Sequence, residues 1–301
     1  MTAPTREETI ARLQRIRSAF SGRMGIAAQN LSTGEAFLFD HEQVFPTAST
    51  IKSAILYEVY RQAEEGTLGL RDRVTLNESD LVKGSGILRD IDPGLQLTVH
   101  DLALLMIIVS DNTATNMMID LVGGPEPVTR SMRSLGLDST TLYRKINFDV
   151  EITDTKWLAE SSPFDLMRLA ALIGQGKAVS PEASAGMLAI MKRQHYTGQF
   201  LRFLGSNAYA AELGEEQLFW TANKTGSITG ARADMGLVSI PGDQLIAYGV
   251  MTDGSRDTGF TSENEGEIAN GRVGRVLLEH WWPEGFATGK IGITSVHLTG
   301  F

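Results

Sequence analysis

Strand-like patterns occur near the two ends of this chain, and a long helical block separates them. Residues 23–39 read as a β-hairpin with a Ser-Thr-Gly turn, and strand patterns return only from Gln217 onward. The signals between Ser49 and Leu204 mostly follow the helical repeat of apolar residues. Because a sheet must bury at least one face, strands from both chain ends are expected to pair in one antiparallel sheet. The sequence therefore predicts an α+β fold.

This fold predicts two structural units with a cleft between them. We assign residues 1–48 and 215–301 to a discontinuous α/β sheet subdomain with flanking helices, and residues 49–214 to an inserted all-α subdomain. A small-molecule site is expected in the cleft where the two units meet. Within the inserted block, Ser162 is expected to cap a helix whose first residue is Pro163.

The composition argues against several classes of function. The chain has 301 residues, a formal charge of -9 and no basic run, so nucleic-acid binding through a basic surface is not expected. Cysteine is absent and the five histidines lie far apart, so the sequence implies no metal site and no cofactor. The longest apolar run, Leu102–Val109, is too short to span a membrane.

The N-terminal residues form a charged amphipathic pattern that lacks the apolar core of a signal peptide. As written, the sequence therefore predicts a cytoplasmic protein. The alternative is a periplasmic or secreted protein from which a signal peptide has been removed.

One pair of residues at the start of the helical block points to chemistry. Ser49 and Lys52 are three positions apart, so they share one face of the predicted helix. A lysine there meets the unfavourable end of the helix dipole, whereas the same end stabilises an alkoxide or an oxyanion. If burial lowers its pKa, the lysine amine can take the serine proton and create a nucleophile. Alone, the pattern carries little weight, since about one match per chain of this size is expected by chance.

Two further tripeptides accompany this pair. Ser-Asp-Asn occurs once, at residues 110–112 where an apolar run ends, and Lys-Thr-Gly occurs once, at residues 224–226 in a strand-like segment. Each is expected by chance in fewer than about one chain in ten, so their joint occurrence is informative. In this order, the motif set resembles that of class A β-lactamases and penicillin-binding proteins. The resemblance covers nearly the whole chain, and the predicted element order agrees with it.

The resemblance implies roles for the residues at these positions. Ser49 would be the acylated nucleophile, and Lys52 its proton partner. Ser110 would pass a proton to the leaving nitrogen, and Asn112 would hydrogen-bond both Lys52 and the amide side chain of the substrate. The backbone N–H groups of Ser49 and Ser227 would form the oxyanion hole.

The resemblance also implies a side of the cleft that binds the substrate carboxylate. Lys224 would direct positive charge toward that carboxylate and toward Ser110, and Thr225 would hydrogen-bond the carboxylate. Gly226 would let the substrate lie close against the strand. Arg232, in the next predicted strand, is a further candidate because a guanidinium matches a carboxylate geometrically. The alternative for this arginine is an ion pair with Asp234 or a position on the surface.

One part of the family pattern is missing. In class A β-lactamases a Glu-x-x-x-Asn pattern precedes the Ser-Ser-Pro helix start, and its glutamate activates the water that frees the acyl serine. Counting back from the helix start, the expected position here falls near Ile146 or Asn147, and neither is a base. Asp149 and Glu151 are the nearest carboxylates and hence the candidate deacylation bases. The alternative is that both are ordinary solvated acids of a loop.

The sequence thus predicts a serine hydrolase of the class A β-lactamase type, acting on a small-molecule β-lactam or a related amide or ester through an acyl-Ser49 intermediate. A D-alanyl peptidase, esterase or amidase on the same scaffold, with slow release of lactams, is an alternative that the missing glutamate favours. A further alternative is a binding or sensor domain that is acylated but does not turn over.

Overall fold

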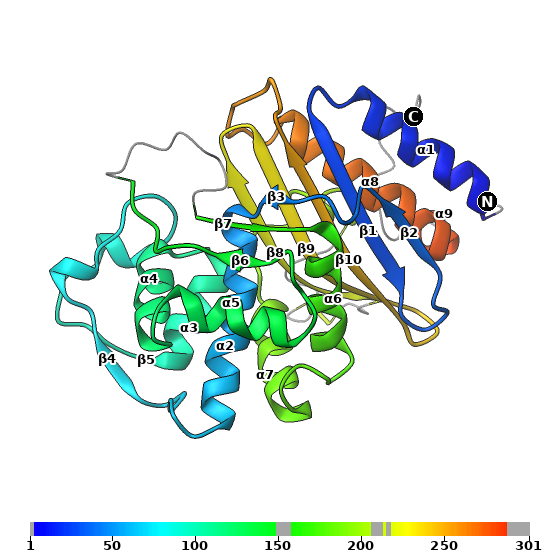
Figure 1. The fold of residues 1–301 in the computed structure, drawn as a ribbon. Helices are drawn as coiled ribbons and strands as arrows, with labels where there is room; N and C mark the ends of the chain where they lie inside the picture. The colour runs from blue at the N-terminus through cyan, green and yellow to red at the C-terminus, as the bar shows by residue number, and fades with distance from the viewer. Residues whose placement is uncertain (1–2, 149–157, 206–212, 215–217, 288–301) are drawn as a thin grey trace.

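The computed structural model describes residues 3–148, 158–205, 213–214 and 218–287. Its centre is a five-stranded antiparallel sheet with the strand order β2-β1-β10-β9-β8 (Figure 1). The strands are β1 (Arg23–Asn30), β2 (Ala36–Phe39), β8 (Trp220–Ile228), β9 (Ala231–Ile240) and β10 (Gln244–Asp253). Strands from both parts of the chain therefore share one sheet, which confirms the predicted fold class.

The helices nearest the two ends of the chain cover one face of this sheet. α1 (Arg6–Ala19) and α8 (Glu265–Trp281) pack against each other there, and the short α9 (Pro283–Ala287) follows α8 (Figure 1). Strand residues such as Ile26 and Val250 bury their side chains in a core with Leu13 of α1 and Val273 of α8. The amphipathic patterns at the two ends of the sequence thus become the outer layer of the fold.

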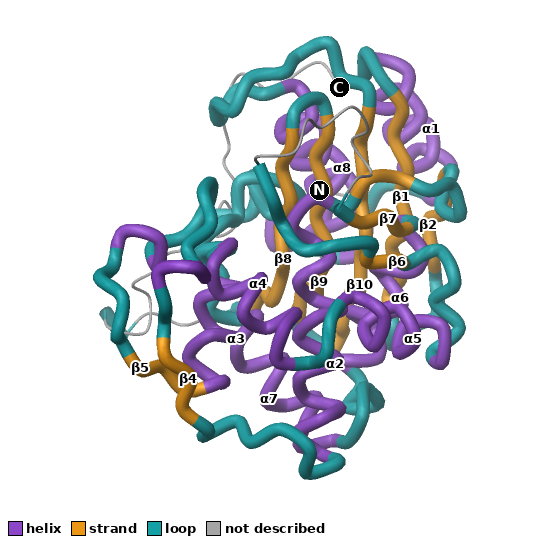
Figure 2. Tube along the Cα trace, turned by 60° about the vertical axis from the view of Figure 1, so that its left-hand side comes forward, coloured by secondary structure: helices purple, strands orange, loops and turns teal. Residues whose placement is uncertain are grey.

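The helical block packs against the opposite face, where α6 (Pro163–Gly174) contacts β1, β9 and β10 (Figure 2). Gly249 of β10 permits this approach, because a Cβ there would lie 2.3 Å from the carbonyl oxygen of Pro163. Four other helices of the block contact α2, whose residues 52–60 are all buried. α2 spans Lys52–Glu64, and the four helices that contact it are α3 (Val99–Ile108), α4 (Asn112–Leu121), α5 (Pro125–Ser134) and α7 (Pro181–Met191).

Several short elements were not predicted, because two or three residues carry no detectable repeat. A second sheet has the order β3-β7-β6, and its strand β3 leads directly into the turn that contains Ser49. The short elements are β3 (Phe45–Pro46), β4 (Arg73–Thr75), β5 (Gln96–Thr98), β6 (Thr141–Leu142), β7 (Ala159–Ser161) and the 3₁₀ helices η1 (Ala48–Ile51), η2 (Glu78–Asp80) and η3 (Leu88–Asp90).

The local predictions at element ends are confirmed. The hydroxyl of Ser162 accepts a hydrogen bond of 3.1 Å from the backbone N–H of Asp165, and Pro163 is the first residue of α6. The predicted hairpin is β1–β2, in which Ala28 lies opposite Phe37. The proposed boundaries between the two subdomains stay a prediction. In the described part of the chain, no helix combines the length and apolarity needed to cross a membrane.

Candidate active site

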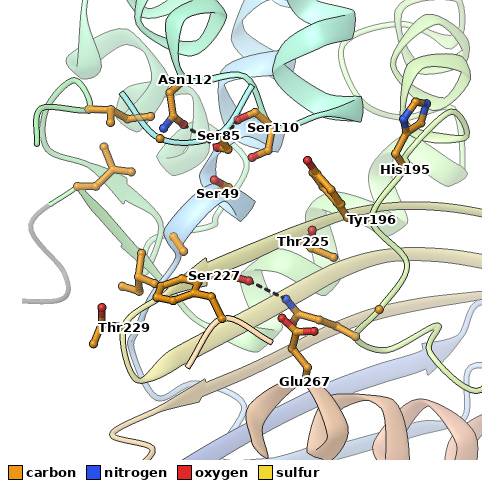
Figure 3. A pocket seen from close by; sticks show the side chains of 18 of the residues that line it. Ser49, Ser85, Ser110, Asn112, His195, Tyr196, Thr225, Ser227, Thr229 and Glu267 are labelled. Atoms are coloured by element: carbon orange, nitrogen blue, oxygen red, sulfur yellow. Dashed lines mark hydrogen bonds between the residues drawn. The ribbon is translucent and has the colours of Figure 1, made fainter. Parts of the chain in front are cut away.

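A cleft of about 1110 Å³ opens beside the edge strand β8, next to the N-termini of α2 and α4. Figure 3 shows that polar side chains from separate segments of the chain gather around it. Its polar lining includes Ser49, Ser85, Ser110, Asn112, Thr225 and Ser227. Residues from all three sequence motifs therefore meet in one cleft, although up to 176 positions separate them in the chain, from 49 to 225.

Ser49 and Lys52 lie on one continuous turn. Ser49 belongs to η1 and lines the cleft, and Lys52 is the first residue of α2. Ala48, just before the serine, has a φ of +45°, a left-handed conformation that is strained for a residue with a side chain and that clusters at functional sites. Lys52 has no exposed surface, so it is not a solvated helix lysine. Burial of an amine at this position requires polar partners inside the protein.

The partners of Lys52 come from the Ser-Asp-Asn segment. Its Nζ lies 2.7 Å from the carbonyl oxygen of Ser110, 3.0 Å from the hydroxyl oxygen of Ser110 and 2.9 Å from Oδ1 of Asn112. Ser110 has a φ of +55°, and in this backbone conformation both its carbonyl and its hydroxyl reach the lysine. Asn112 is held by a hydrogen bond of 3.0 Å from its Nδ2 to the carbonyl oxygen of Lys83.

Lys224 approaches the same serine from the sheet. Its Nζ donates to the hydroxyl oxygen of Ser110 at 3.2 Å and to the carbonyl oxygen of Thr225 at 2.6 Å, and its side chain is fully buried. The Ser110 hydroxyl therefore lies between two amines, Lys52 on α2 and Lys224 on β8. A hydroxyl in this position can receive a proton from one side and deliver it to a substrate atom in the cleft.

Burial sets the protonation of the two lysines. Burial lowers the pKa of Lys52 well below its ordinary value, and the positive charge of Lys224 lowers this pKa further. The negative charge of Asp111 has the opposite effect and raises it. Burial also lowers the pKa of Lys224, to about 7, against the opposing charge of Asp234. The lowered pKa of Lys52 favours its neutral amine form. Two of its neighbours, the Ser110 carbonyl and Asn112 Oδ1, are acceptors for its N–H bonds, so its lone pair remains for a hydroxyl proton.

Asp111 and Ser85 are supporting residues for which no role was predicted. The Asp111 carboxylate caps α4 at the backbone N–H of Ala114 and accepts from the backbone N–H groups of Ile87 and Leu88, at 2.7 and 2.9 Å. The Ser85 hydroxyl donates to the carbonyl oxygen of Ser110 at 2.7 Å. Together they tie the rim loop at residues 85–88 to the segment that holds Lys52.

Gly226 is required by the protein backbone itself. A Cβ at this position would lie 2.6 Å from the carbonyl oxygen of Thr47 and 2.8 Å from the backbone nitrogen of Ser49. Strand β8 therefore lies directly against the turn that carries the nucleophile candidate. Close approach of a substrate was the predicted reason for a glycine at this position. The atoms nearest to it are instead backbone atoms of the turn. Ser227, the next residue of β8, lines the same cleft as Ser49, and the predicted oxyanion hole stays a prediction.

Arg232 does not have the position expected of a substrate contact. Its side chain is 1% exposed, its Nε lies 3.3 Å from Oε1 of Glu267, and its terminal nitrogens donate to the carbonyl oxygens of Ile228, Ala231 and Gly259. These partners accept from four of the five N–H donors of the guanidinium. The predicted contact with a substrate carboxylate is thus not supported. The predicted alternatives, an ion pair with Asp234 or a surface position, are also wrong, because Arg232 is buried and pairs with Glu267 of α8. Glu267 itself lines the cleft.

The candidate deacylation bases Asp149 and Glu151 lie outside the described residues. The structure does place Ile146, near which the family glutamate was expected. Asn116 of α4 donates to the carbonyl oxygen of Ile146 and accepts from its backbone N–H, each at 2.8 Å. Both backbone groups of Ile146 are thereby fixed, and its side chain lines the cleft.

The wall around Ile146 is apolar. Phe148 and Leu158 line the cleft with it, and Phe148 lies next to Gly84 on the rim, since a Cβ on that glycine would be 3.0 Å from the phenylalanine ring. Among the described residues that line the cleft, the carboxylate is that of Glu267. The wall where the family has its water-activating base therefore has no acid in the part of the chain that the structure describes.

The opposite wall was missed in the sequence. Residues His195–Gln199 follow α7 and line the cleft beside Thr225 and Ser227, as Figure 3 shows for Tyr196. Gln199 is nearly fully buried and donates to the carbonyl oxygen of Gly226 at 3.1 Å. This segment lacks a helical or strand repeat, so the sequence contained no signal for its position.

Comparison with known proteins agrees with this geometry. The profile of the Beta-lactamase enzyme family matches residues 6–281. A beta-lactamase of Rhodobacter capsulatus is 29% identical over 205 residues, which cover 67% of this chain and 68% of that protein.

Two solved structures are also similar. The beta-lactamase from Sphaerobacter thermophilus has a TM-score of 0.80 and 29% identity, covering 96% of this chain and 100% of its own. A leucine-to-glutamate mutant of PBP-A, solved as an acyl-enzyme complex with penicillin G, has a TM-score of 0.79 and 28% identity, covering 93% and 98%. With a family match over nearly its whole length and the motif residues assembled in one cleft, this chain belongs to the beta-lactamase enzyme family.

Proposed function

We propose that this protein is a serine hydrolase that β-lactams acylate at Ser49 and that releases the acyl group slowly. The observation that carries the proposal is the Ser110 hydroxyl, held between Lys52 at 3.0 Å and Lys224 at 3.2 Å in the cleft that Ser49 lines. This arrangement provides a base, a proton donor and a positive charge around one nucleophile.

Acylation follows from these groups. Neutral Lys52 takes the proton of the Ser49 hydroxyl, and the serine oxygen attacks the lactam carbonyl carbon. The negative charge that develops on the carbonyl oxygen is stabilised by the backbone N–H groups of Ser49 and Ser227. As the carbon–nitrogen bond breaks, Ser110 gives its proton to the ring nitrogen and regains one from the Lys52 ammonium. Lys224 and Thr225 bind the carboxylate of the substrate.

Deacylation lacks an equivalent base in the described wall. Hydrolysis of the acyl ester requires a water that loses a proton as it attacks. Ile146, Phe148 and Leu158 cannot accept that proton, and they line the wall on which the family glutamate is expected. An ester of Ser49 with a β-lactam should therefore persist, whereas a better-matched natural ester or peptide can leave the site faster. This supports a D-alanyl peptidase, esterase or amidase as the natural activity.

The similarity to PBP-A supports acylation by penicillins, because its leucine-to-glutamate mutant was solved as an acyl-enzyme complex with penicillin G. The second candidate is an efficient β-lactamase, favoured by the similarity to the beta-lactamases of Rhodobacter capsulatus and Sphaerobacter thermophilus. In that case Asp149 or Glu151 supplies the base.

The two candidates differ in their pre-steady-state kinetics. We expect a cephalosporin whose absorbance changes on ring opening to give a burst of one product per protein, followed by a much slower steady rate, because acylation outpaces deacylation. Stopped-flow absorbance measures both phases. Rapid linear turnover without a burst would contradict the proposal and favour the β-lactamase. The variants Asp149→Asn and Glu151→Gln would then identify its base, and a burst with no later turnover would indicate the sensor mode.

A further inference from the structure

Gln199 is a buried glutamine in the wall of the cleft, and the reaction described so far gives it no role. It is 2% exposed, and both ends of its amide have partners. Its Nε2 donates to the carbonyl oxygen of Gly226 at 3.1 Å and to the hydroxyl oxygen of Ser227 at 3.4 Å (Figure 3). Its Oε1 accepts from Nδ2 of Asn270 on α8, at 2.9 Å. Gln199 therefore joins β8 to α8 at the position of the predicted oxyanion donor.

The partners fix which way the amide of Gln199 points. A carbonyl oxygen can only accept a hydrogen bond, so the amide nitrogen must face Gly226. The amide oxygen then faces Asn270, which has to donate. A glutamine meets both requirements, whereas an apolar side chain of similar length would leave the Gly226 carbonyl without this donor.

The backbone around Gln199 lies directly against α8. A Cβ on Gly274 would be 1.9 Å from the carbonyl oxygen of Phe200, and a Cβ on Gly271 would be 3.1 Å from the carbonyl oxygen of Gln199. The same carbonyl of Gln199 accepts from the backbone N–H of Arg202 at 2.8 Å. The side chain of Gln199 thus extends toward β8 from a backbone that the helix holds in place.

The backbone N–H of Ser227 faces the open edge of the sheet. Ser227 lies opposite Arg232 in the register of β8 and β9. The backbone N–H and the carbonyl of Arg232 both contact the hydroxyl of Thr252 on β10, at 3.1 and 3.2 Å, so they face away from β8. Ser227 and Arg232 are therefore a pair that exchanges no backbone hydrogen bonds, and the N–H of Ser227 faces the edge beside which the cleft lies.

The Gly226 carbonyl and the Ser227 N–H belong to one peptide unit. This unit is planar and trans, so the two groups point in opposite directions within one plane. A rotation that moved the carbonyl away from Gln199 would also turn the N–H. The hydrogen bond from Gln199 to the carbonyl therefore sets the direction of the N–H on the other side of the peptide.

We propose that Gln199 is a positioning residue for acylation, which holds the Gly226–Ser227 peptide so that the N–H of Ser227 faces the developing oxyanion. The proposal rests on the proposed function, in which the backbone N–H groups of Ser49 and Ser227 stabilise that oxyanion. A donor contributes to this stabilisation only if it is aimed in advance at the position where the charge develops.

The variant Gln199→Met tests this assignment, because methionine fills a similar volume but has no donor for the Gly226 carbonyl. Stopped-flow measurement over a range of penicillin G concentrations separates the rate constant for acylation from the dissociation constant of the complex that precedes it. We expect the rate constant to fall about 30-fold, since the N–H is no longer held in position. The dissociation constant should change less than about threefold, because the oxyanion forms only in the transition state.

Gln194→Met is the matched control. The Nε2 of Gln194 also donates to backbone carbonyls, those of Ile107 and of Asn223 on β8, at 2.9 and 3.2 Å. Gln194 is not among the described residues that line the cleft, so its substitution should leave the rate constant within about twofold of the parent value. If Gln199→Met does not fold, Asn270→Ala removes the donor to Gln199 and should slow acylation about threefold.

The acyl-enzyme provides a spectroscopic measurement that a loss of stability alone would not change. Donors in the oxyanion hole polarise the ester carbonyl and lower its stretching frequency, which infrared difference spectra resolve when the lactam carbonyl carries ¹³C. The ester band of the Gln199→Met protein should lie at a higher frequency than that of the parent protein. The band of the Gln194→Met protein should coincide with that of the parent.

A folded Gln199→Met protein, or Asn270→Ala if that variant replaces it, would overturn the proposal by acylating at the parent rate. Equal losses in Gln199→Met and Gln194→Met would overturn it as well, and so would an ester band that does not move.

If penicillin G does not acylate the parent protein, the proposed function fails, and the hold of Gln199 on the peptide is measured separately. In protein labelled with ¹⁵N-serine, the amide resonance of Ser227 is identified by its loss in Ser227→Ala. This resonance should move in Gln199→Met and stay in place in Gln194→Met. A resonance that does not move in Gln199→Met would overturn the positioning role too.

Discussion

We expect the substitution Lys52→Met to lower the rate constant for acylation of Ser49 by a β-lactam about 10³-fold. Methionine has a similar length but no lone pair on nitrogen, so the serine hydroxyl loses its base. The substitution should not unfold the protein, because Lys52 is fully buried and an apolar side chain is less costly there than an amine. Stopped-flow measurement of acylation, together with a thermal melt, separates loss of the base from loss of the fold.

The matched control is Lys192→Met. Lys192 follows α7, and its Nζ lies 3.8 Å from the centre of the Trp220 ring, so it too contacts the protein closely but belongs to no motif. The substitution Lys192→Met should leave the rate constant for acylation within about twofold of that of the parent protein, because surface substitutions usually have small effects. Acylation of the Lys52→Met protein at the parent rate would show that another group takes the serine proton.

The pH dependence of acylation should have an ascending limb set by Lys52. Its pKa is lowered by burial and by the charge of Lys224, so the neutral amine extends to lower pH than in a free lysine and is lost as the pH falls through that lowered pKa. The limb should vanish in Lys52→Met, which distinguishes a base from a merely structural lysine.

The second large effect is expected at Ile146, where Ile146→Glu should raise the deacylation rate constant about 10²-fold or more. The hydrogen bonds from Asn116 fix the backbone of this residue, so a longer acidic side chain would start from the same position in the cleft wall. A carboxylate there can take a proton from the attacking water. The burst of product should then change into sustained turnover, which the same stopped-flow experiment measures.

Ile146→Gln is the matched control, because glutamine has nearly the same shape as glutamate but cannot act as a base at neutral pH. It should leave the acyl-enzyme long-lived. If both variants accelerated deacylation equally, the cause would be a less tightly packed cleft wall. That result would contradict the role of a carboxylate base at position 146. A thermal melt of both variants is needed, since a polar side chain at a site that is 6% exposed lowers stability.

The motif residues could be identified from the sequence because each motif is contiguous and its chemistry depends on residue type. Ser49 and Lys52 share a turn whatever the remainder of the fold does, and the start of α6 at Pro163 follows from local capping rules. The sheet composed of strands from both parts of the chain was likewise predictable, because its strands are eight to ten residues long, apart from the shorter β2.

The contacts that were missed join residues far apart in the chain. Arg232 pairs with Glu267, and the alternative partner considered, Asp234, binds Phe200, Asn223 and Tyr248 instead. Which carboxylate the arginine reaches depends on the face of β9 from which each side chain projects and on what α8 presents there. A sequence pattern does not contain that information.

The position of Ile146 in the cleft wall could not be predicted either, because it also depends on a contact between residues far apart in the chain. Asn116 holds Ile146 through both atoms of its amide, across 30 positions of sequence. Asparagine in a helix gives no sign of such a distant partner. Counting back from the helix start gives an expected position near Ile146 or Asn147, whereas the apolar surroundings of Ile146 could be seen only in the fold.

The central claim is that Ser49 becomes covalently acylated, and intact-protein mass spectrometry after mixing with penicillin G tests it most directly. The account predicts that the parent protein gains the mass of one penicillin within the first time points, that this adduct decays slowly, and that the Ser49→Ala protein shows no adduct. An adduct of equal size on Ser49→Ala would contradict the assignment of the nucleophile. A parent protein that shows neither an adduct nor hydrolysed penicillin would contradict the claim that β-lactams react in this cleft.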